Sequence, residues 1–137
     1  MNEVKVKWLS GMRFEGRSGE GAGVIMDSKK EPSGLEKAPT PMDTVLIALG
    51  GCTGMDVVSI LEKMHVKFES LDIDIKGERT EEHPLVYKKI EIIYKIIGDV
   101  DEEKVKKAAE LSMEKYCSVA AMLKKSAEID HRVEILR

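Results

Sequence analysis

Residues Lys37 to His65, KAPTPMDTVLIALGGCTGMDVVSILEKMH, form the stretch that decides the fold of this 137-residue chain. Thr40 is a good helix N-cap, Pro41 suits the first helical position, and Asp43 places a negative charge in the first turn. Apolar residues then recur at steps of three and four, and almost no charge interrupts them up to Asp56. The pattern predicts a central helix over residues 40–65 that is apolar on most of its circumference and therefore buried.

Three glycines surround Cys52 in the middle of this predicted helix: Gly50, Gly51 and Gly54. Each glycine in a helix interior costs roughly 1 kcal/mol relative to alanine. Three of them within five residues therefore indicate the close approach of another backbone or of a substrate. Tight helix packing, with Cys52 as a small apolar filler, is the alternative interpretation.

The composition limits the class of protein. The 22 basic and 25 acidic residues give a net charge of −3, which argues against nucleic acid or an acidic membrane as a partner. The charged, alternating N-terminus is not typical of a signal peptide, and we expect no apolar run to reach the ~20 residues that span a bilayer. We therefore expect one soluble, cytoplasmic domain over residues 1–137.

The remaining patterns separate strands from helices along the chain. Val4, Val6 and Trp8 alternate with charged residues and predict a half-buried first strand. The full prediction is three short strands within 1–36, a polar loop over 28–39, the central helix, two adjacent antiparallel strands within 68–97, a second helix over 101–125, and a last strand over 127–136. Segregated strands and helices are typical of an α+β fold. Because the central helix is too apolar for one sheet face to cover, we expect a second subunit in a two-fold dimer.

Each predicted helix carries one cysteine among small residues, Cys52 in GGCTG and Cys117 in KYCSVAA. They lie 65 positions apart, so only tertiary packing can bring them together. A nucleophilic thiol must be a thiolate, which requires a nearby cation or donor to lower a pKa of about 8.5. A second thiol within reach makes the oxidised state recoverable as a disulfide. The pair fits such a scheme, although no C-x-x-C motif makes the signal local.

The three histidines, His65, His83 and His131, are scattered over three predicted elements without the spacing of metal ligands. His83, next to Pro84, is interpreted as a turn residue and His131 as a strand residue. We therefore expect neither a metal site nor another cofactor.

Two further side chains have both a functional and a structural interpretation. Asp56, four residues after Cys52, falls on the same helix face, where it would hold a cation or a water near the thiol. A cap, or a salt bridge to Lys63 or an arginine, explains it as well. Tyr116 would donate a hydrogen bond into the site, but core packing is the favoured interpretation.

The segment TPMDTVLIALGGCTGMDVV on the first helix, together with EKYCSVAAML on the second, resembles the OsmC/Ohr family of thiol peroxidases. The resemblance covers essentially the whole chain, including the EEHP turn, and is nearest to the less characterised branch of OsmC-like proteins. It implies an OsmC-like fold with antiparallel sheets packed on two main helices. It also implies an intertwined homodimer with two active sites at the interface.

The resemblance further implies a two-cysteine mechanism. Cys52 attacks the peroxide bond and becomes a sulfenic acid, and Cys117 condenses with it to a disulfide. A dithiol reductant then resets the pair, of the dihydrolipoamide (lipoyl) type in the hydroperoxide resistance branch. The implied substrate is an organic hydroperoxide.

Two other family positions carry over less well. The hydroperoxide resistance enzymes place a glutamate ten residues before the first cysteine, where it holds an arginine against the thiolate. That position is Met42 here, and Asp43 on the next position points about 100° away along a helix of 3.6 residues per turn. The candidates for the arginine are Arg13 and Arg17, which share a face in an ideal strand, so alternation cannot separate them.

Three functions remain open from the sequence. The first is a cysteine peroxidase acting on organic hydroperoxides in the stress response. The second is a dimeric thiol-containing binding protein with little peroxide turnover, which the methionine at position 42 favours. The third is a structural dimer with inert cysteines. A reactive Cys52 that pairs with Cys117 would distinguish the first from the other two.

Overall fold

The computed structural model describes residues 1–29 and 38–137, which form two compact units, Met1–Val45 and Leu46–Arg137. Most of the polar loop predicted over residues 28–39 lies outside the described residues, at positions 30–37.

Unit 1 holds a three-stranded antiparallel sheet of β1 (Lys5–Ser10), β2 (Arg13–Arg17) and β3 (Val24–Met26), in that order. Trp8 is paired with Phe14, and Phe14 with Met26, so these apolar side chains share one face. All six β1 residues are exposed, and Trp8 keeps 60% of its surface. The prediction of a half-buried first strand is therefore wrong for the single chain, because a small sheet has no inner layer of its own that buries a face.

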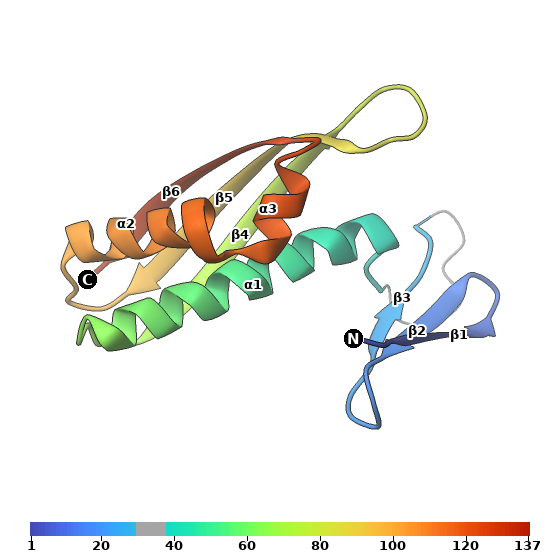
Figure 1. The fold of residues 1–137 in the computed structure, drawn as a ribbon, viewed down its shortest axis with the longest axis horizontal. Coiled ribbons are helices and arrows are strands. Elements are labelled where there is room, and N and C mark those ends of the chain that lie inside the picture. Colours follow the sequence, from blue (N-terminus) through green and yellow to red (C-terminus); the bar gives the residue numbers. More distant parts are fainter. Residues whose placement is uncertain (30–37) are drawn as a thin grey trace. The chain divides into compact units, whose positions relative to one another are not determined.

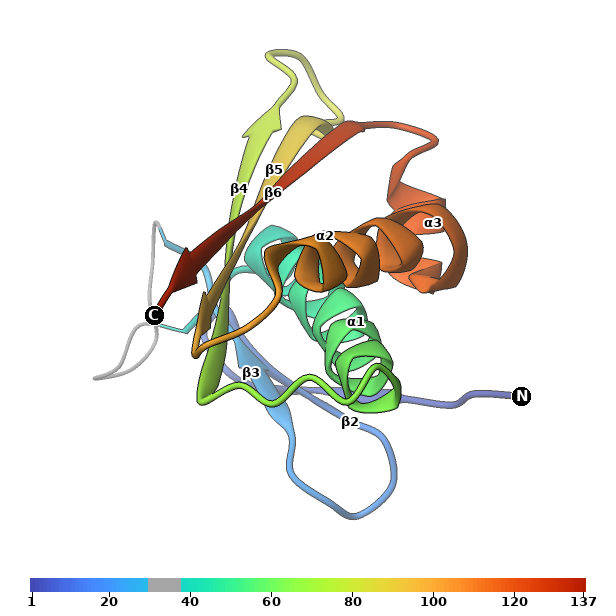
Figure 2. The ribbon, with the colours of Figure 1, turned by 90° about the vertical axis from the view of Figure 1, so that its left-hand side faces the viewer.

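Unit 2 is a two-layer arrangement in which the helices cover one face of a second sheet (Figures 1 and 2). Its elements are α1 (Pro41–Lys63, which begins in unit 1), β4 (Ser70–Arg79), β5 (Tyr87–Ile97), α2 (Glu102–Leu111), η1 (Ser112–Tyr116), α3 (Ser118–Leu123) and β6 (Glu128–Leu136). The sheet order is β4-β5-β6. β4 and β5 are antiparallel neighbours, as the sequence predicts. β6 runs parallel to β5, a direction that the sequence analysis does not predict. The α+β class is confirmed.

The central helix predicted over residues 40–65 runs from Pro41 to Lys63. Its buried side chains are spaced four apart: Leu49, Thr53, Val57 and Leu61. Burial on most of the circumference is wrong for the single chain, because one sheet face covers only one stripe of a helix. Ile47 and Met55 on the other side remain 57% and 77% exposed.

By length and composition alone, α1 is long and apolar enough to cross a membrane. This corrects the expectation that no apolar run of the chain reaches such a length. The core helix of a soluble protein passes the same test, so the finding is weak evidence for a membrane span.

Two of the three glycines in α1 are explained by packing on β4. A Cβ added at Gly50 would lie 3.0 Å from Ile75 Cδ1, and one at Gly54 would lie 3.0 Å from Ile73 Cδ1. These glycines let the helix lie close to the sheet, as the packing interpretation predicts. Gly51 differs, because a Cβ there would meet nothing within 4 Å.

Candidate thiol site

The second helix, predicted as continuous over residues 101–125, is divided into α2, the π-turn η1 and the short helix α3. In η1 the Cys117 N–H donates to the Ser112 carbonyl, five residues back, at 2.8 Å. Skipping the usual i→i+4 partner frees the Met113 carbonyl, and the Lys124 ammonium donates to it. This substitute donor satisfies a buried carbonyl that the wider turn would otherwise leave unpaired.

The π-turn changes which side chains face inward. A regular helix would continue the apolar stripe from Ser112 to Tyr116 and leave Cys117 at its edge. With one extra residue in the turn, Cys117 is instead buried at 3% exposure, and Tyr116 is 50% exposed. The prediction that Tyr116 packs in the core is therefore wrong. Its ring lies 5.2 Å from the Lys115 ammonium.

Cys117 lies at the junction of two helical segments. It ends η1 and is the N-cap of α3, where its Sγ accepts a hydrogen bond from the Ala120 N–H at 3.4 Å. Burial raises the pKa of the Cys117 thiol to about 11 and outweighs the Ala120 hydrogen bond, which lowers it. This thiol therefore stays protonated at neutral pH.

Cys52 lies beside Cys117. Hydrogen bonding to Cys52, and the charge of Cys52, both raise the pKa of the Cys117 thiol further. The structure thus brings together two side chains that are 65 positions apart in the sequence. Both thiols are free, and they differ in access, because Cys52 is half-buried on α1 whereas Cys117 is buried.

A chain of buried hydroxyl groups runs beside the two cysteines. Thr53 Oγ1 lies 2.7 Å from both Tyr94 OH and Ser112 Oγ, and Ser112 Oγ donates to Asp56 Oδ2 at 2.8 Å. Thr53, Tyr94 and Ser112 have no exposed surface. The chain therefore joins α1, β5 and η1 through polar contacts inside the core, and such contacts are strong when every member is satisfied.

The carboxylate at the end sets the direction of this chain. A carboxylate only accepts, so the single hydroxyl hydrogen of Ser112 is used on Asp56. Ser112 must then accept from Thr53, and Thr53 in turn accepts from Tyr94. Burial raises the pKa of Tyr94 to about 12, so its phenol is a donor at neutral pH.

Asp56 thus has a role that neither sequence interpretation anticipated. Its carboxylate accepts from Ser112, rather than holding a cap or a salt bridge to Lys63. Sequence reasoning also missed Thr53 and Tyr94. Both residues carry a hydroxyl group at a position where the periodicity expects an apolar, inward-facing side chain. Because a buried hydroxyl needs a hydrogen-bond partner, these two positions could have indicated a buried polar contact.

Asp43, a predicted site residue, is part of a capping box in unit 1. Its Oδ2 accepts from the Thr40 N–H at 3.0 Å, and its own N–H donates to Thr40 Oγ1 at 3.1 Å. The Thr40 hydrogen bonds, with a contribution from Lys29, lower the pKa of Asp43. The carboxylate is therefore committed to starting α1, and Met42 occupies the position before it.

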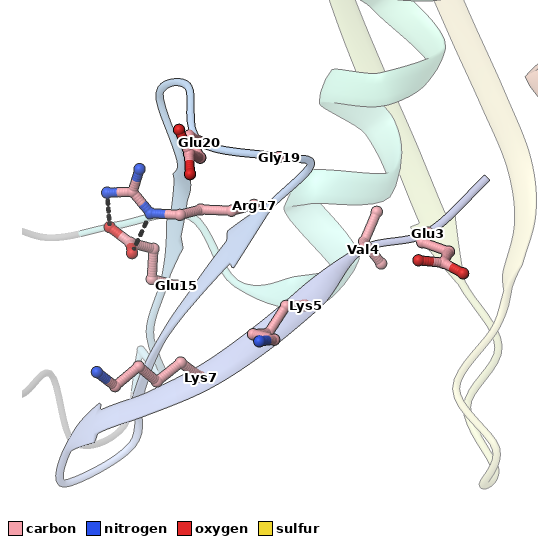
Figure 3. Close-up of a pocket in the computed structure, with 8 residues that line it drawn as sticks. All are labelled: Glu3, Val4, Lys5, Lys7, Glu15, Arg17, Gly19 and Glu20. Atoms are coloured by element: carbon pink, nitrogen blue, oxygen red, sulfur yellow. Dashed lines mark hydrogen bonds and ion pairs between the residues drawn. The ribbon is translucent and has the colours of Figure 1, made fainter.

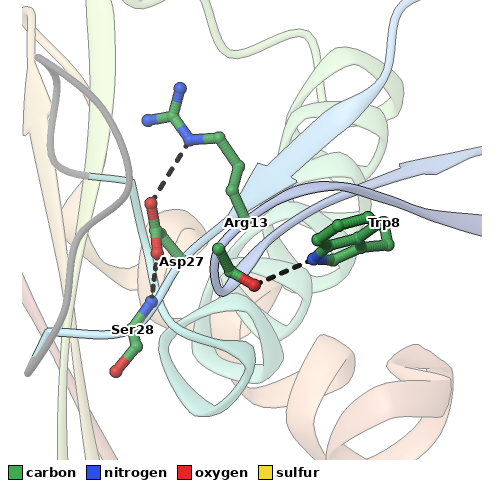
Figure 4. Close-up of polar contacts among 5 residues, drawn as sticks. Trp8, Arg13, Asp27 and Ser28 are labelled. Atoms are coloured by element: carbon green, nitrogen blue, oxygen red, sulfur yellow. Dashed lines mark hydrogen bonds and ion pairs between the residues drawn. The ribbon is translucent and has the colours of Figure 1, made fainter.

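The two predicted arginines, both in unit 1, are each paired with a carboxylate. Arg13 Nε lies 3.3 Å from Oδ2 of Asp27, which is 2% exposed (Figure 4). Arg17 pairs with Glu15 at 2.7 Å on the exposed, charged face of the sheet (Figure 3). The structure thus distinguishes a half-buried Arg13 from an exposed Arg17, and the action of either on the Cys52 thiolate stays a prediction.

Two hollows bear on ligand binding. The first, of about 560 Å³, lies over β1 and β2, where Lys5, Lys7 and Arg17 alternate with glutamates (Figure 3). These mixed charges favour no class of ligand. The second, which we call the α1/β4 groove, has a volume of about 580 Å³ and a mostly apolar lining that includes Gly51, Met55, Val58, Phe68 and Leu71. Across residues 1–29 and 38–137, no three His, Cys, Asp or Glu side chains group as metal ligands would.

Comparisons with known proteins show the family and the fold. A family model described as OsmC-like protein matches residues 34–132. Protein YhfA of Escherichia coli K12 is 41% identical over 135 residues, which cover 98% of each chain. The crystal structure of a hypothetical protein from Aquifex aeolicus is 35% identical, covers 100% of this chain and 98% of its own, and has a TM-score of 0.82. The organic hydroperoxide resistance protein OhrB of Bacillus subtilis covers 98% of each chain with a TM-score of 0.69, and at 11% identity it shares the fold alone.

Proposed function

Because the chain belongs to the OsmC-like protein family, we propose that it is a thiol-dependent peroxidase that reduces organic hydroperoxides in oxidative stress defence. The observation that carries the proposal is the adjacency of Cys52 and Cys117 in unit 2. Two thiols that meet from separate helices, one accessible and one buried, are what a peroxidatic and a resolving cysteine require.

In the first step the Cys52 thiolate attacks the distal oxygen of the hydroperoxide. The O–O bond breaks, the sulfur is oxidised to a sulfenic acid, and the alkoxide leaves with a proton as the alcohol. Cys52 suits this step because it is half-buried on α1 rather than enclosed. Cys117 does not suit this first step, because burial keeps its thiol protonated and a protonated thiol is a poor nucleophile toward peroxide.

In the second step the Cys117 sulfur attacks the Cys52 sulfenic acid. The S–S bond forms, the S–O bond breaks, and the hydroxyl leaves with the thiol proton as water. A dithiol reductant of the lipoyl type then returns both cysteines to thiols by disulfide exchange and is itself oxidised to a disulfide. No other cofactor is needed.

The choice of organic hydroperoxides is supported by the apolar α1/β4 groove. Its lining includes Gly51, the residue before Cys52, but not Cys52 itself, and it would hold an alkyl or aryl group more favourably than water. OhrB, which shares the fold, is named as an organic hydroperoxide resistance protein.

We further propose a homodimer in the cytoplasm. The apolar face of the β1-β2-β3 sheet leaves Val6 and Trp8 55% and 60% exposed, and α1 leaves Met55 77% exposed. Apolar patches of this kind mark interaction surfaces in soluble proteins. A second copy of the chain would cover them.

The second candidate function is a dimeric binding protein with little peroxide turnover. The α1/β4 groove favours it, because an apolar groove of this size would hold a small ligand without any thiol chemistry. This function predicts a retained apolar ligand and thiols that peroxide does not oxidise.

The test uses the reduced full-length protein and one equivalent of cumene hydroperoxide, followed by hydrogen peroxide in a parallel series. Free thiols and intact mass are measured for wild type, Cys52→Ser and Cys117→Ser. We expect wild type to lose both thiols quickly, with a mass loss of two hydrogen atoms, and Cys52→Ser to lose none. Cys117→Ser should stop at a sulfenic or higher oxide on Cys52.

Oxidation by either peroxide that is no faster than that of a free small-molecule thiol would overturn the peroxidase. Native mass spectrometry of the same sample then tests the binding protein through the mass of a bound apolar ligand.

A further inference from the structure

Three hydrogen bonds of Ser112 lie at the point where the two cysteine-bearing helical regions meet. Its hydroxyl donates to Asp56 Oδ2 at 2.8 Å and accepts from Thr53 Oγ1 at 2.7 Å. Its carbonyl accepts from the Cys117 N–H at 2.8 Å. Ser112 is fully buried, as is its hydrogen bond from Thr53, whereas the bond to the half-buried Asp56 is partly buried.

Both partners of the hydroxyl follow Cys52, the thiol that reacts first, within about one turn of α1. Thr53 directly follows Cys52, and Asp56 lies one turn further along α1. The hydroxyl therefore ties η1 to the turn of α1 that carries Cys52. The carbonyl of the same residue fixes the backbone of Cys117, so one residue links the backbone supports of both sulfurs.

The π-turn makes this link necessary. It turns Cys117 inward by one extra residue, and the Cys117 N–H donates to the Ser112 carbonyl in place of the regular i→i+4 bond. A serine at the first position of the turn, anchored to a carboxylate on the facing helix, opposes a return to regular helix.

We propose that Ser112 is a positioning residue that holds Cys117 against Cys52 and so sets the rate at which the Cys52 sulfenic acid closes to the disulfide. The proposal rests on the peroxidase function. In the closing step the S–O bond breaks and the S–S bond forms, while the Cys117 proton leaves with the hydroxyl as water. Ser112 takes no part in the electron transfer. It keeps the attacking Cys117 sulfur close to the Cys52 sulfur, and holding two reacting atoms close together raises the rate of their reaction.

The experiment separates the two steps in a single turnover. Reduced protein is mixed with one equivalent of cumene hydroperoxide and quenched at intervals with dimedone, which labels sulfenic acid, and intact mass then gives the sulfenic acid and disulfide populations. For Ser112→Ala we expect sulfenic acid formation within about twofold of wild type and disulfide closure slowed at least about tenfold, because only the second step depends on the position of Cys117. Sulfenic acid should accumulate in this variant and not in wild type.

Tyr94→Phe is the matched control. It removes a buried hydroxyl from the far end of the same row of hydroxyl groups and leaves the hydrogen bonds of Ser112 in place. We expect this variant to lose stability yet close at the wild-type rate. Equal slowing of closure in both variants would overturn the proposal, because the effect would then follow core stability and not the link to Cys117.

A second pair of variants, at Asp56, tests the same link if Ser112→Ala does not fold. Asp56 is only half-buried, so Asp56→Ala should fold while removing the acceptor that anchors Ser112. Asp56→Asn keeps an oxygen acceptor and loses the charge. We expect slow closure in the alanine variant and near wild-type closure in the asparagine variant; wild-type closure in both would overturn the proposal.

A diamide arm keeps this inference distinct from the proposed function. Diamide accepts two electrons and two protons from a pair of thiols and closes a disulfide without peroxide. If wild type closes with diamide but not with peroxide, the peroxidase fails, and the order of closure rates among the variants still tests Ser112. Wild-type closure by Ser112→Ala with diamide and with peroxide would overturn the inference alone.

Discussion

Cys52 and Cys117 lie side by side but are held by different kinds of backbone. Cys52 lies within a 23-residue regular helix, one stripe of which packs on the sheet through side chains four residues apart. Cys117 lies between a five-residue π-turn and a six-residue helix. The first sulfur is placed by helical periodicity, and the second by a local departure from it.

The two kinds of backbone give two identical side chains different surroundings. The regular helix leaves Cys52 half-buried. The π-turn encloses Cys117, and burial raises its thiol pKa to about 11 even though it caps a helix N-terminus. In this pair, desolvation outweighs the N-terminal hydrogen bond.

The largest effect is expected at Thr53, which connects the two regions. Thr53→Val leaves the buried Tyr94 hydroxyl without an acceptor and should lower the free energy of unfolding by about 2–3 kcal/mol. Thr53→Ser keeps the hydroxyl and should lose only about 1 kcal/mol for the missing methyl group. Denaturant titration of both variants measures the difference. Equal losses would mean that the chain of hydroxyl groups does not stabilise the fold.

An intermediate effect is expected at Lys124, which supports only the π-turn. Its ammonium donates to the Met113 carbonyl that the turn releases. Lys124→Met keeps the apolar stem and should lower the free energy of unfolding by about 1–2 kcal/mol, toward the low end for a hydrogen bond from a charged group because the lysine is exposed. Lys125→Met, on the neighbouring exposed position, is the control and should change it by less than about 0.5 kcal/mol. Two equal values would show that the released carbonyl needs no donor.

The smallest effect is expected at Asp43, which supports only the regular helix. Asp43→Ala breaks the capping box and should cost about 0.5–1 kcal/mol, while Asp43→Asn retains an acceptor for the Thr40 N–H and should cost less. Both variants should react with iodoacetamide at Cys52 as wild type does. Slower alkylation of Cys52 without loss of stability would mean that Asp43 acts on the Cys52 thiol, as the sequence analysis expects.

The sequence could predict the regular parts of this arrangement. Apolar residues at steps of three and four indicate α1, and alternating apolar residues indicate β4 and β5. Each period arises because one face of the element is buried. The Thr40 cap was predicted because its chemistry is local. The two cysteines could be named as a pair, although their contact depends on packing across 65 positions.

The rest depends on long-range contacts that no local pattern encodes. The π-turn over Ser112–Tyr116 has an ordinary helical composition, and it is supported by Asp56 through Ser112 and by Lys124. A regular helical period therefore predicts that Tyr116 faces the core, whereas the π-turn interrupts this period just before Cys117. The parallel direction of β6 was missed for a similar reason, since alternation gives the faces of a strand but not its direction.

The most direct test of the unequal pair is site-resolved alkylation. Reduced wild type is treated with limiting iodoacetamide from pH 7 to pH 11, and peptide mapping follows each cysteine separately. Only the thiolate reacts, so a pKa raised from 9.0 to about 11 should make Cys117 roughly a hundredfold slower at pH 7 than an unshifted thiol, with its rate rising until about pH 11. We predict that Cys52 is labelled first at pH 7 and that Cys117 becomes labelled only in alkali. Labelling of Cys117 as early as Cys52 at pH 7 would contradict the account.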